Sequence, residues 1–211
     1  MTENDANPFH FTIEQISDAP RAFLLKGFLT PEECTQFIDM AEKSMAPSTA
    51  VDPETGEFIQ FAARSSSGTY FMLGQTPLIA EIEDRIARLT DIPVVNGEGL
   101  QVLNYQIGQQ YMPHFDFFDP ALKGSAKPLA CGGQRVATCL MYLYAAEEGG
   151  ETHFPAVDLK VTPVAGDALI FYNLLPTGEV DRQSLHASLP VIQGEKWVAT
   201  KWLRERPYVA Q

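Results

Sequence analysis

Two histidines and one aspartate form the pattern in this sequence with the clearest chemical meaning. His114 and Asp116 are separated by one residue, and His186 follows much later in the chain. On a strand, positions i and i+2 point the same way, so His114 and Asp116 can reach one ion while Phe115 faces the other side. Two imidazoles and one carboxylate on one face of a metal leave three coordination positions open, as in non-haem Fe(II) sites. Structural zinc prefers four protein ligands, so the pattern favours an open iron site.

A lysine downstream of the second histidine could complete this site. Lys196 begins a segment, residues 196–203, whose imperfect alternation is typical of a strand. A co-substrate with two carboxylates needs a cation at one end and a metal at the other. A buried ammonium is tolerable when it is paired and hydrogen-bonded. Lys196 is therefore the candidate carboxylate anchor.

The two other histidines are not needed as ligands. The chain has four histidines in all, and His10 lies near the terminus while His153 follows a Gly-Gly-Glu-Thr run. A His and an Asp two residues apart often belong to nothing more than a solvated strand face. The same three ligands would also accept Mn(II), Co(II) or Zn(II).

Several ordered motifs surround these residues. They lie at residues 104–111, 132–138, 140–144, 148–155, 166–173 and 184–202. In this order and spacing they resemble the catalytic domain of the collagen-type prolyl 4-hydroxylases, which are 2-oxoglutarate and Fe(II)-dependent dioxygenases. A looser resemblance extends back to about Arg21 through residues 28–34 and 63–68.

The resemblance implies roles for individual residues. His114, Asp116 and His186 would bind Fe(II), and Lys196 would pair with the distal carboxylate of 2-oxoglutarate. Further matches to the co-substrate pocket are Tyr105, Thr152 and Trp202. Two arginines, Arg135 and Arg64, match positions of a peptide-binding groove. Aromatic residues on strands usually pack in the core, and Thr152 could be an ordinary strand residue.

The implied reaction is hydroxylation of peptidyl proline to 4-hydroxyproline. O2 and 2-oxoglutarate would be consumed, succinate and CO2 released, and ascorbate would act as reductant. One alternative is a dioxygenase that hydroxylates another residue or a free amino acid, because the iron and co-substrate motifs do not encode the acceptor. Another is a non-catalytic binding module with the same fold. The presence of all three ligands together with Lys196 disfavours the latter.

Length and composition fit a single enzyme domain. The chain has 211 residues, 45% hydrophobic and 20% charged, and a formal net charge of −12. We expect one domain over residues 1–211. The acidic charge argues against nucleic acid as a partner, and a proline-containing peptide or protein is the expected substrate. The polar, acidic first residues and the absence of a long apolar run predict a cytoplasmic protein without a membrane segment. The three cysteines fit no disulfide framework and no zinc pattern.

The elements that must position the site are two helices and a series of strands. Thr30-Pro31 and Thr76-Pro77 are helix starts, and we expect helices over residues 31–45 and 77–91 that pack on a sheet. Residues 20–95 would form a mainly helical support. Short apolar or alternating runs between residues 97 and 206 predict a mainly β sandwich or jelly roll, and the resemblance implies a double-stranded β-helix. The expected strands cover residues 100–106, 111–117, 135–144, 160–164, 168–172, 185–191 and 196–203.

Two polar stretches are predicted to be loops. Residues 47–62 are expected to form a hairpin or loop, and residues 119–133 are rich in Gly, Pro, Ala and Lys. The first could close over the substrate as a lid, which would exclude water from the reaction.

Overall fold

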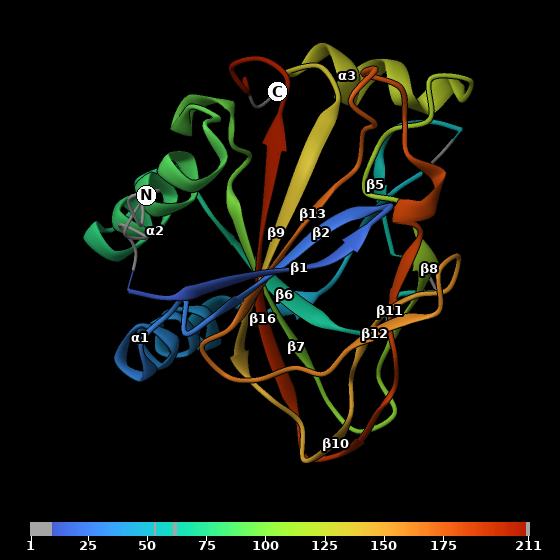
Figure 1. Ribbon diagram of the computed structural model, residues 1–211. Coiled ribbons are helices and arrows are strands. Elements are labelled where there is room, and N and C mark those ends of the chain that lie inside the picture. Colours follow the sequence, from blue (N-terminus) through green and yellow to red (C-terminus); the bar gives the residue numbers. More distant parts are fainter. Residues whose placement is uncertain (1–9, 53, 61–62, 210–211) are drawn as a thin grey trace, which may run out of the picture.

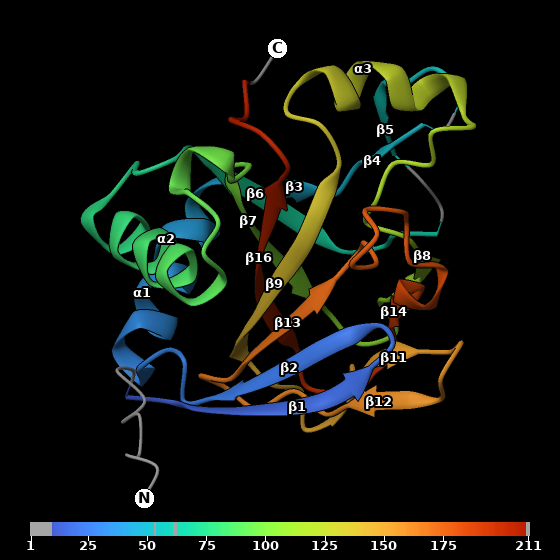
Figure 2. The same ribbon diagram turned by 45° about the horizontal axis from the view of Figure 1, so that its top comes forward.

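Two antiparallel sheets form the body of the molecule. The computed structural model describes residues 10–52, 54–60 and 63–209. The larger sheet has eight strands, in the order β1 (Thr12–Asp18), β2 (Arg21–Lys26), β13 (Ala168–Tyr172), β9 (Arg135–Tyr144), β16 (Lys196–Arg204), β7 (Leu100–Tyr105), β6 (Ser67–Phe71) and β3 (Ala46–Pro47). The smaller sheet has the order β12 (Leu159–Val161), β11 (Thr152–Phe154), β14 (His186–Ser188) and β8 (Tyr111–His114). The larger sheet separates the smaller one from the helices α1 (Pro31–Ala41) and α2 (Pro77–Thr90) (Figures 1 and 2). The expected mainly β jelly roll is confirmed.

Short elements complete the chain. Two two-stranded sheets pair β10 (Glu148–Gly149) with β15 (Val191–Gln193) and β4 (Ala50–Val51) with β5 (Phe58–Ile59). The α-helices are α1 (Pro31–Ala41), α2 (Pro77–Thr90) and α3 (Ala126–Ala130). Single 3-10 turns cover Glu42–Ser44, Val94–Asn96, Lys123–Ser125 and Arg182–Ser184.

Strand β16 runs through the centre of the larger sheet. All nine of its residues are buried, because β9 and β7 flank it and both of its faces are covered. Successive side chains of a strand point to opposite faces. Trp197, Ala199 and Leu203 accordingly pack in the core beneath the helices, while Lys196 and Trp202 point into the cavity between the sheets. Strand β16 thus contributes side chains both to the hydrophobic core and to the cavity between the sheets.

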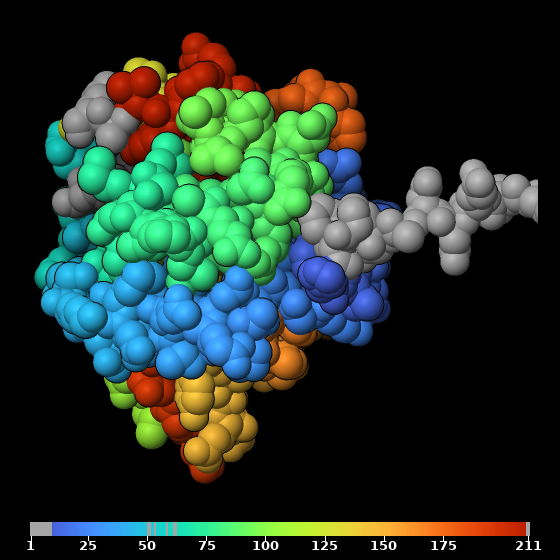
Figure 3. All heavy atoms as spheres, turned by 90° about the vertical axis from the view of Figure 1, so that its left-hand side faces the viewer, coloured from blue at the N-terminus to red at the C-terminus, as the bar shows by residue number. Residues whose placement is uncertain are grey.

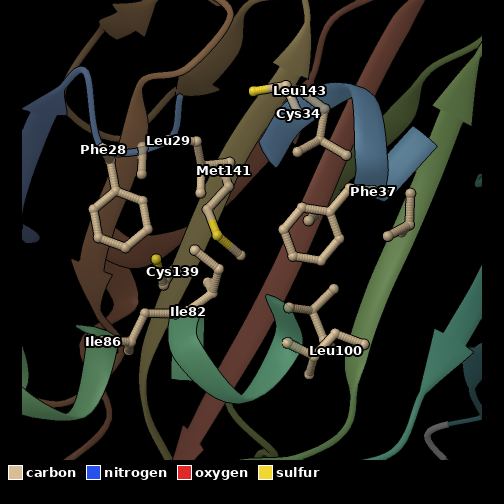
Figure 4. Close-up of a cluster of buried hydrophobic side chains, with 14 of the residues drawn as sticks. Phe28, Leu29, Cys34, Phe37, Ile82, Ile86, Leu100, Cys139, Met141 and Leu143 are labelled. Carbon is tan, nitrogen blue, oxygen red and sulfur yellow. The ribbon is translucent and has the colours of Figure 1, made fainter. Parts of the chain in front are cut away.

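Helices α1 and α2 cover the outer face of the larger sheet, where Figure 3 shows them side by side. Thr30 caps α1 in a capping box with Glu33, and the Thr76 side chain caps α2. Phe37 of α1 and Ile82 of α2 are fully buried against Leu100 (Figure 4). The two helices form where the start signals place them, and they buttress the sheet. Helix α1 ends at Ala41 and gives way to a 3-10 turn.

The expectation that residues 20–95 are a mainly helical support is only partly correct. This segment also contributes β2, which pairs with β13, and β6, which pairs with β7. Both strands extend the larger sheet beyond the part formed by residues 97–206. Pairing partners in distant parts of the chain do not show in a local sequence pattern, so the helical spacing of apolar residues led to the prediction of a mainly helical segment.

The first of the two polar stretches forms the expected hairpin, and the second contains a short helix that was not expected. Strands β4 and β5 form a hairpin within residues 47–62, of which residues 53, 61 and 62 lie outside the described part. In residues 119–133, α3 follows a 3-10 turn. Lys127 of α3 forms an ion pair with Glu57 across a distance of 2.8 Å, so the hairpin lies against this segment. Whether the hairpin closes as a lid stays a prediction.

Among the helices of the described residues, none is long and apolar enough to cross a membrane.

A buried ion pair joins α2 to β16. The Nζ atom of Lys201 lies 2.6 Å from Oε1 of Glu83, and both side chains are at most 2% exposed. Lys201 also donates to the carbonyl of Glu98, and Glu83 accepts from the backbone N–H of Gly74. Burial lowers the pKa of Lys201, which the partner carboxylate opposes.

Replacing Glu83 with alanine is expected to lower the free energy of unfolding by about 3 to 5 kcal/mol, because Lys201 would keep a buried charge without its carboxylate. Urea unfolding measures this loss. Asp84→Ala is the matched control on the same helix. It breaks an exposed ion pair with Arg88 and should cost no more than about 1 kcal/mol. A loss for Glu83→Ala as small as that of the control would contradict the prediction.

Candidate active site

The structure brings His114, Asp116 and His186 together at the open end of the cavity between the sheets. One potential ligand atom from each lies within 4.8 Å of the others. His114 at the end of β8 and His186 at the start of β14 are directly paired across the smaller sheet. The Nε2 atoms of His114 and His186 lie 3.8 and 3.7 Å from the two carboxylate oxygens of Asp116. Strand β8 ends at His114, so Asp116 projects from the bend after the strand, not from the strand expected over residues 111–117.

Backbone carbonyls hold both imidazole rings in one orientation. Nδ1 of His114 lies 2.9 Å from the carbonyl oxygen of Met112, and Nδ1 of His186 lies 3.0 Å from that of Ser184. A carbonyl only accepts, so each Nδ1 carries the proton and each Nε2 keeps its lone pair. Burial, with the neighbouring His186, lowers the pKa of His114 to about 3. The His114 ring is therefore neutral, as metal binding requires, and Nε2 of each ring faces the Asp116 carboxylate.

Asp116 is held as a carboxylate. Burial alone would raise its pKa, but the His186 and His114 rings, the Arg135 guanidinium and the Thr138 hydroxyl together lower it to about 2. The Thr138 hydroxyl donates to Oδ2 of Asp116 over 2.7 Å. Two imidazole nitrogens and one carboxylate oxygen on one side of an open space fit a divalent cation and leave room for further ligands.

Lys196 lies in the same cavity, deep between the sheets. It is 2% exposed, and its Nζ atom donates to the carbonyl of Gly150 over 2.7 Å and to the hydroxyl of Ser188. The ammonium also lies 4.6 Å from the centre of the Tyr105 ring, its partner across β16 and β7. Within the described ranges, no carboxylate lies within ion-pair distance of it. The cavity therefore offers a cation to a bound carboxylate.

Thr152 lines the same cavity as Lys196. Its hydroxyl lies 2.9 Å from the hydroxyl of Tyr142, which is fully buried. Sequence reasoning gave no role to Tyr142, Ser188 or Thr138. They stand within matched motifs or at alternating strand positions, but no spacing distinguishes them from core residues.

The buried position of Lys196 predicts how co-substrate binding depends on pH. Burial lowers the pKa of Lys196 to about 7, with Glu151 opposing the shift. A bound carboxylate would restore the charged form, so above pH 7 binding must take up a proton. We expect the Kd of 2-oxoglutarate for the Mn(II)-loaded protein to be constant below about pH 7 and to rise about tenfold per pH unit above it.

Calorimetry in two buffers of different ionisation enthalpy measures this proton uptake at pH 8. The Lys196→Ala variant is the control and should take up no proton. A pH-independent Kd in the unsubstituted protein would contradict the prediction.

Trp202 and Arg64 line both the cavity and an outer groove of about 490 Å³, and Arg135 lines the groove. Arg135 stacks over Trp202 at 3.9 Å and forms two hydrogen bonds with the Glu98 carboxylate, at 2.6 and 2.8 Å. Arg64 is 8% exposed and donates to the carbonyl of Thr49 and to the Gln101 side chain. Aromatic side chains form much of the remaining wall, namely Tyr70, Tyr111, Phe115, Phe117 and Phe118.

The two remaining histidines lie apart from the triad. His10 is exposed, and His153 on β11 has its Nε2 atom 3.7 Å from the exposed Asp158 carboxylate. Neither joins the cluster of potential metal ligands.

The chain is similar to known proteins in both sequence and structure. Residues 100–204 match the 2OG-Fe(II) oxygenase superfamily. Probable prolyl 4-hydroxylase 10 of Arabidopsis thaliana is 45% identical over 93% of this chain and 73% of its own length. Prolyl 4-hydroxylase 5 of the same plant is 44% identical over 90% of this chain and 70% of its own. The 2-oxoglutarate complex of the viral collagen prolyl hydroxylase from Paramecium Bursaria Chlorella virus-1 superposes with a TM-score of 0.68 at 32% identity, covering 87% of this chain and 95% of that one.

Proposed function

Since the chain belongs to the prolyl 4-hydroxylases of the 2OG-Fe(II) oxygenase superfamily, we propose that it hydroxylates prolyl residues of a peptide at C4. O2 and 2-oxoglutarate are consumed, and succinate and CO2 are released. The observation that carries this proposal is a single cavity that contains His114, Asp116, His186 and Lys196 and meets an aromatic groove.

The triad supplies the metal site in this proposal. Fe(II) bound by His114, Asp116 and His186 would provide open coordination positions and the redox chemistry that couples O2 to 2-oxoglutarate. The Nδ1 contacts to backbone carbonyls keep both Nε2 atoms directed at the ion, and Thr138 keeps the Asp116 carboxylate in place.

The deep end of the cavity binds the co-substrate. Lys196 pairs with the distal carboxylate of 2-oxoglutarate, while the hydroxyls of Tyr105 and Thr152 assist. The apolar side chains of Leu103 and Phe171 form part of the wall of this cavity. They exclude water from the co-substrate, which strengthens its ion pair with Lys196.

The outer groove receives the peptide. Trp202 lines both the groove and the inner cavity, and its indole N–H has no hydrogen-bond partner within the part of the chain that the structure describes. It can donate to a substrate carbonyl. Arg64 and Arg135 border the same passage and would hold the peptide beside the metal. A groove of about 490 Å³ suits a peptide better than a free amino acid.

The cellular setting is part of the proposal. Cys34, Cys131 and Cys139 are free thiols, which suits a reducing compartment such as the cytoplasm. Ascorbate would return the metal to Fe(II) after turnovers without peptide.

The test is succinate formation by the purified protein with Fe(II), 2-oxoglutarate and ascorbate, with and without a proline-rich peptide library. We expect succinate formation to rise with peptide, and tandem mass spectrometry to place one added oxygen atom on proline. Oxygen on a different residue, or on free proline alone, would favour another hydroxylase. Binding of 2-oxoglutarate without turnover under any of these conditions would favour a non-catalytic module.

A further inference from the structure

A chain of buried hydrogen bonds continues behind Asp116. The Thr138 hydroxyl on β9 donates to Oδ2 of Asp116 over 2.7 Å, and the side-chain amide of Asn173 donates to the Thr138 oxygen over 3.1 Å. Thr138 is 1% exposed and Asn173 is fully buried. The three residues come from three separate segments, and Thr138 pairs with Phe171 across β9 and β13.

The direction of these bonds is determined by the groups involved. A hydroxyl has one proton, and because the Asp116 carboxylate can only accept, Thr138 must give its proton to Asp116. The Thr138 oxygen can then only accept, so the amide nitrogen of Asn173, not its oxygen, must face it. Asn173 therefore orients the hydroxyl that orients the carboxylate.

The backbone of Asn173 leads to the other side of the triad. Its carbonyl accepts from the N–H of Asp181 over 2.8 Å, and the Asp181 carbonyl accepts both the N–H and the hydroxyl of Ser184. The Ser184 carbonyl in turn binds Nδ1 of His186. Asn173, Asp181 and Ser184 are all at least 95% buried. The segment between β13 and β14 is thus hydrogen-bonded back to the Asn173 backbone through Asp181. The same segment leads to the triad residue His186.

We infer that Thr138 and Asn173 are positioning residues of the metal centre. Thr138 presents the Asp116 carboxylate through its hydroxyl, and Asn173 holds that hydroxyl while its backbone anchors the turn that carries His186. The inference rests on the proposed metal site. Groups that orient metal ligands typically account for about 10- to 100-fold in metal affinity.

The test measures Mn(II) affinity by electron paramagnetic resonance, without substrate or turnover. Thr138→Val keeps the shape of the side chain and removes the hydroxyl, and it should raise the Kd for Mn(II) about 10- to 100-fold. Thr138→Ser keeps the hydroxyl and should bind Mn(II) as the unsubstituted protein does. Thr69→Val is the matched control: this buried β6 threonine bonds only to the Ser44 hydroxyl among the described contacts, and its removal should leave the Kd unchanged.

A second variant tests Asn173 itself. Asn173→Asp keeps the size of the side chain but replaces the donor with an acceptor that competes for the Thr138 proton, so the Kd should rise as in Thr138→Val. An unchanged Kd in Thr138→Val, or equal weakening in Thr138→Val and Thr138→Ser, would overturn the inference. Should Asn173→Asp fail to fold, the comparison of Thr138→Val with Thr138→Ser still tests the inference. Failure of the unsubstituted protein to bind Mn(II) would instead overturn the proposed metal site.

Discussion

Replacing His186 with alanine is expected to abolish both metal binding and the release of succinate from 2-oxoglutarate. His186 supplies one of three potential ligand atoms, and it pairs directly with His114 across the smaller sheet. Its loss leaves one imidazole and one carboxylate, too few to hold a divalent ion in the facial arrangement. Mn(II) affinity and succinate formation with Fe(II) are the two measurements. Circular dichroism should show that the variant remains folded.

His153→Ala is the matched control for this experiment. His153 is also a partly buried histidine of the smaller sheet, but it lies outside the ligand cluster. We expect unchanged metal affinity and turnover. Full iron-dependent activity in His186→Ala would refute the triad, and lost metal binding in His153→Ala would show that the ligand set has been assigned wrongly.

Replacing Lys196 with alanine is expected to raise the KM for 2-oxoglutarate about 10- to 100-fold. A charge-assisted hydrogen bond contributes about 1.5 to 3 kcal/mol, and each 1.4 kcal/mol corresponds to a factor of ten. Mn(II) affinity without co-substrate should not change, because Lys196 contacts Gly150, Ser188 and Tyr105 but none of the triad. Steady-state kinetics with varied 2-oxoglutarate and direct titration of Mn(II) separate the two effects.

The control for Lys196→Ala is Lys160→Ala on the exposed surface of β12. It removes a lysine of the same size and should leave both constants unchanged. If the KM for 2-oxoglutarate stayed the same in Lys196→Ala, the anchor would have to lie elsewhere. Arg64, the other cation that lines the cavity, would be the next residue to replace.

The sequence predicts much of this molecule because many of its signals are local. The Thr-Pro starts at residues 30 and 76 mark α1 and α2, since capping depends on residues within one turn. Alternating apolar runs predict the strands of the jelly roll for the same reason. The chemistry of His114, Asp116, His186 and Lys196 can also be inferred from residue type, because few combinations of side chains suit both a metal and a dianion.

The tertiary structure alone decides how those residues are held. The bend that carries Asp116 beyond β8, the hydrogen bonds from Asn173 through Thr138, and the ion pair of Glu83 with Lys201 join segments far apart in the chain. The local periodicity of a sequence does not indicate which distant residues will be in contact. A threonine or asparagine on a strand therefore cannot be assigned a hydrogen-bonding role before its neighbours are known. Residue type determines which chemistry is available, whereas long-range packing determines the direction in which each donor and acceptor points.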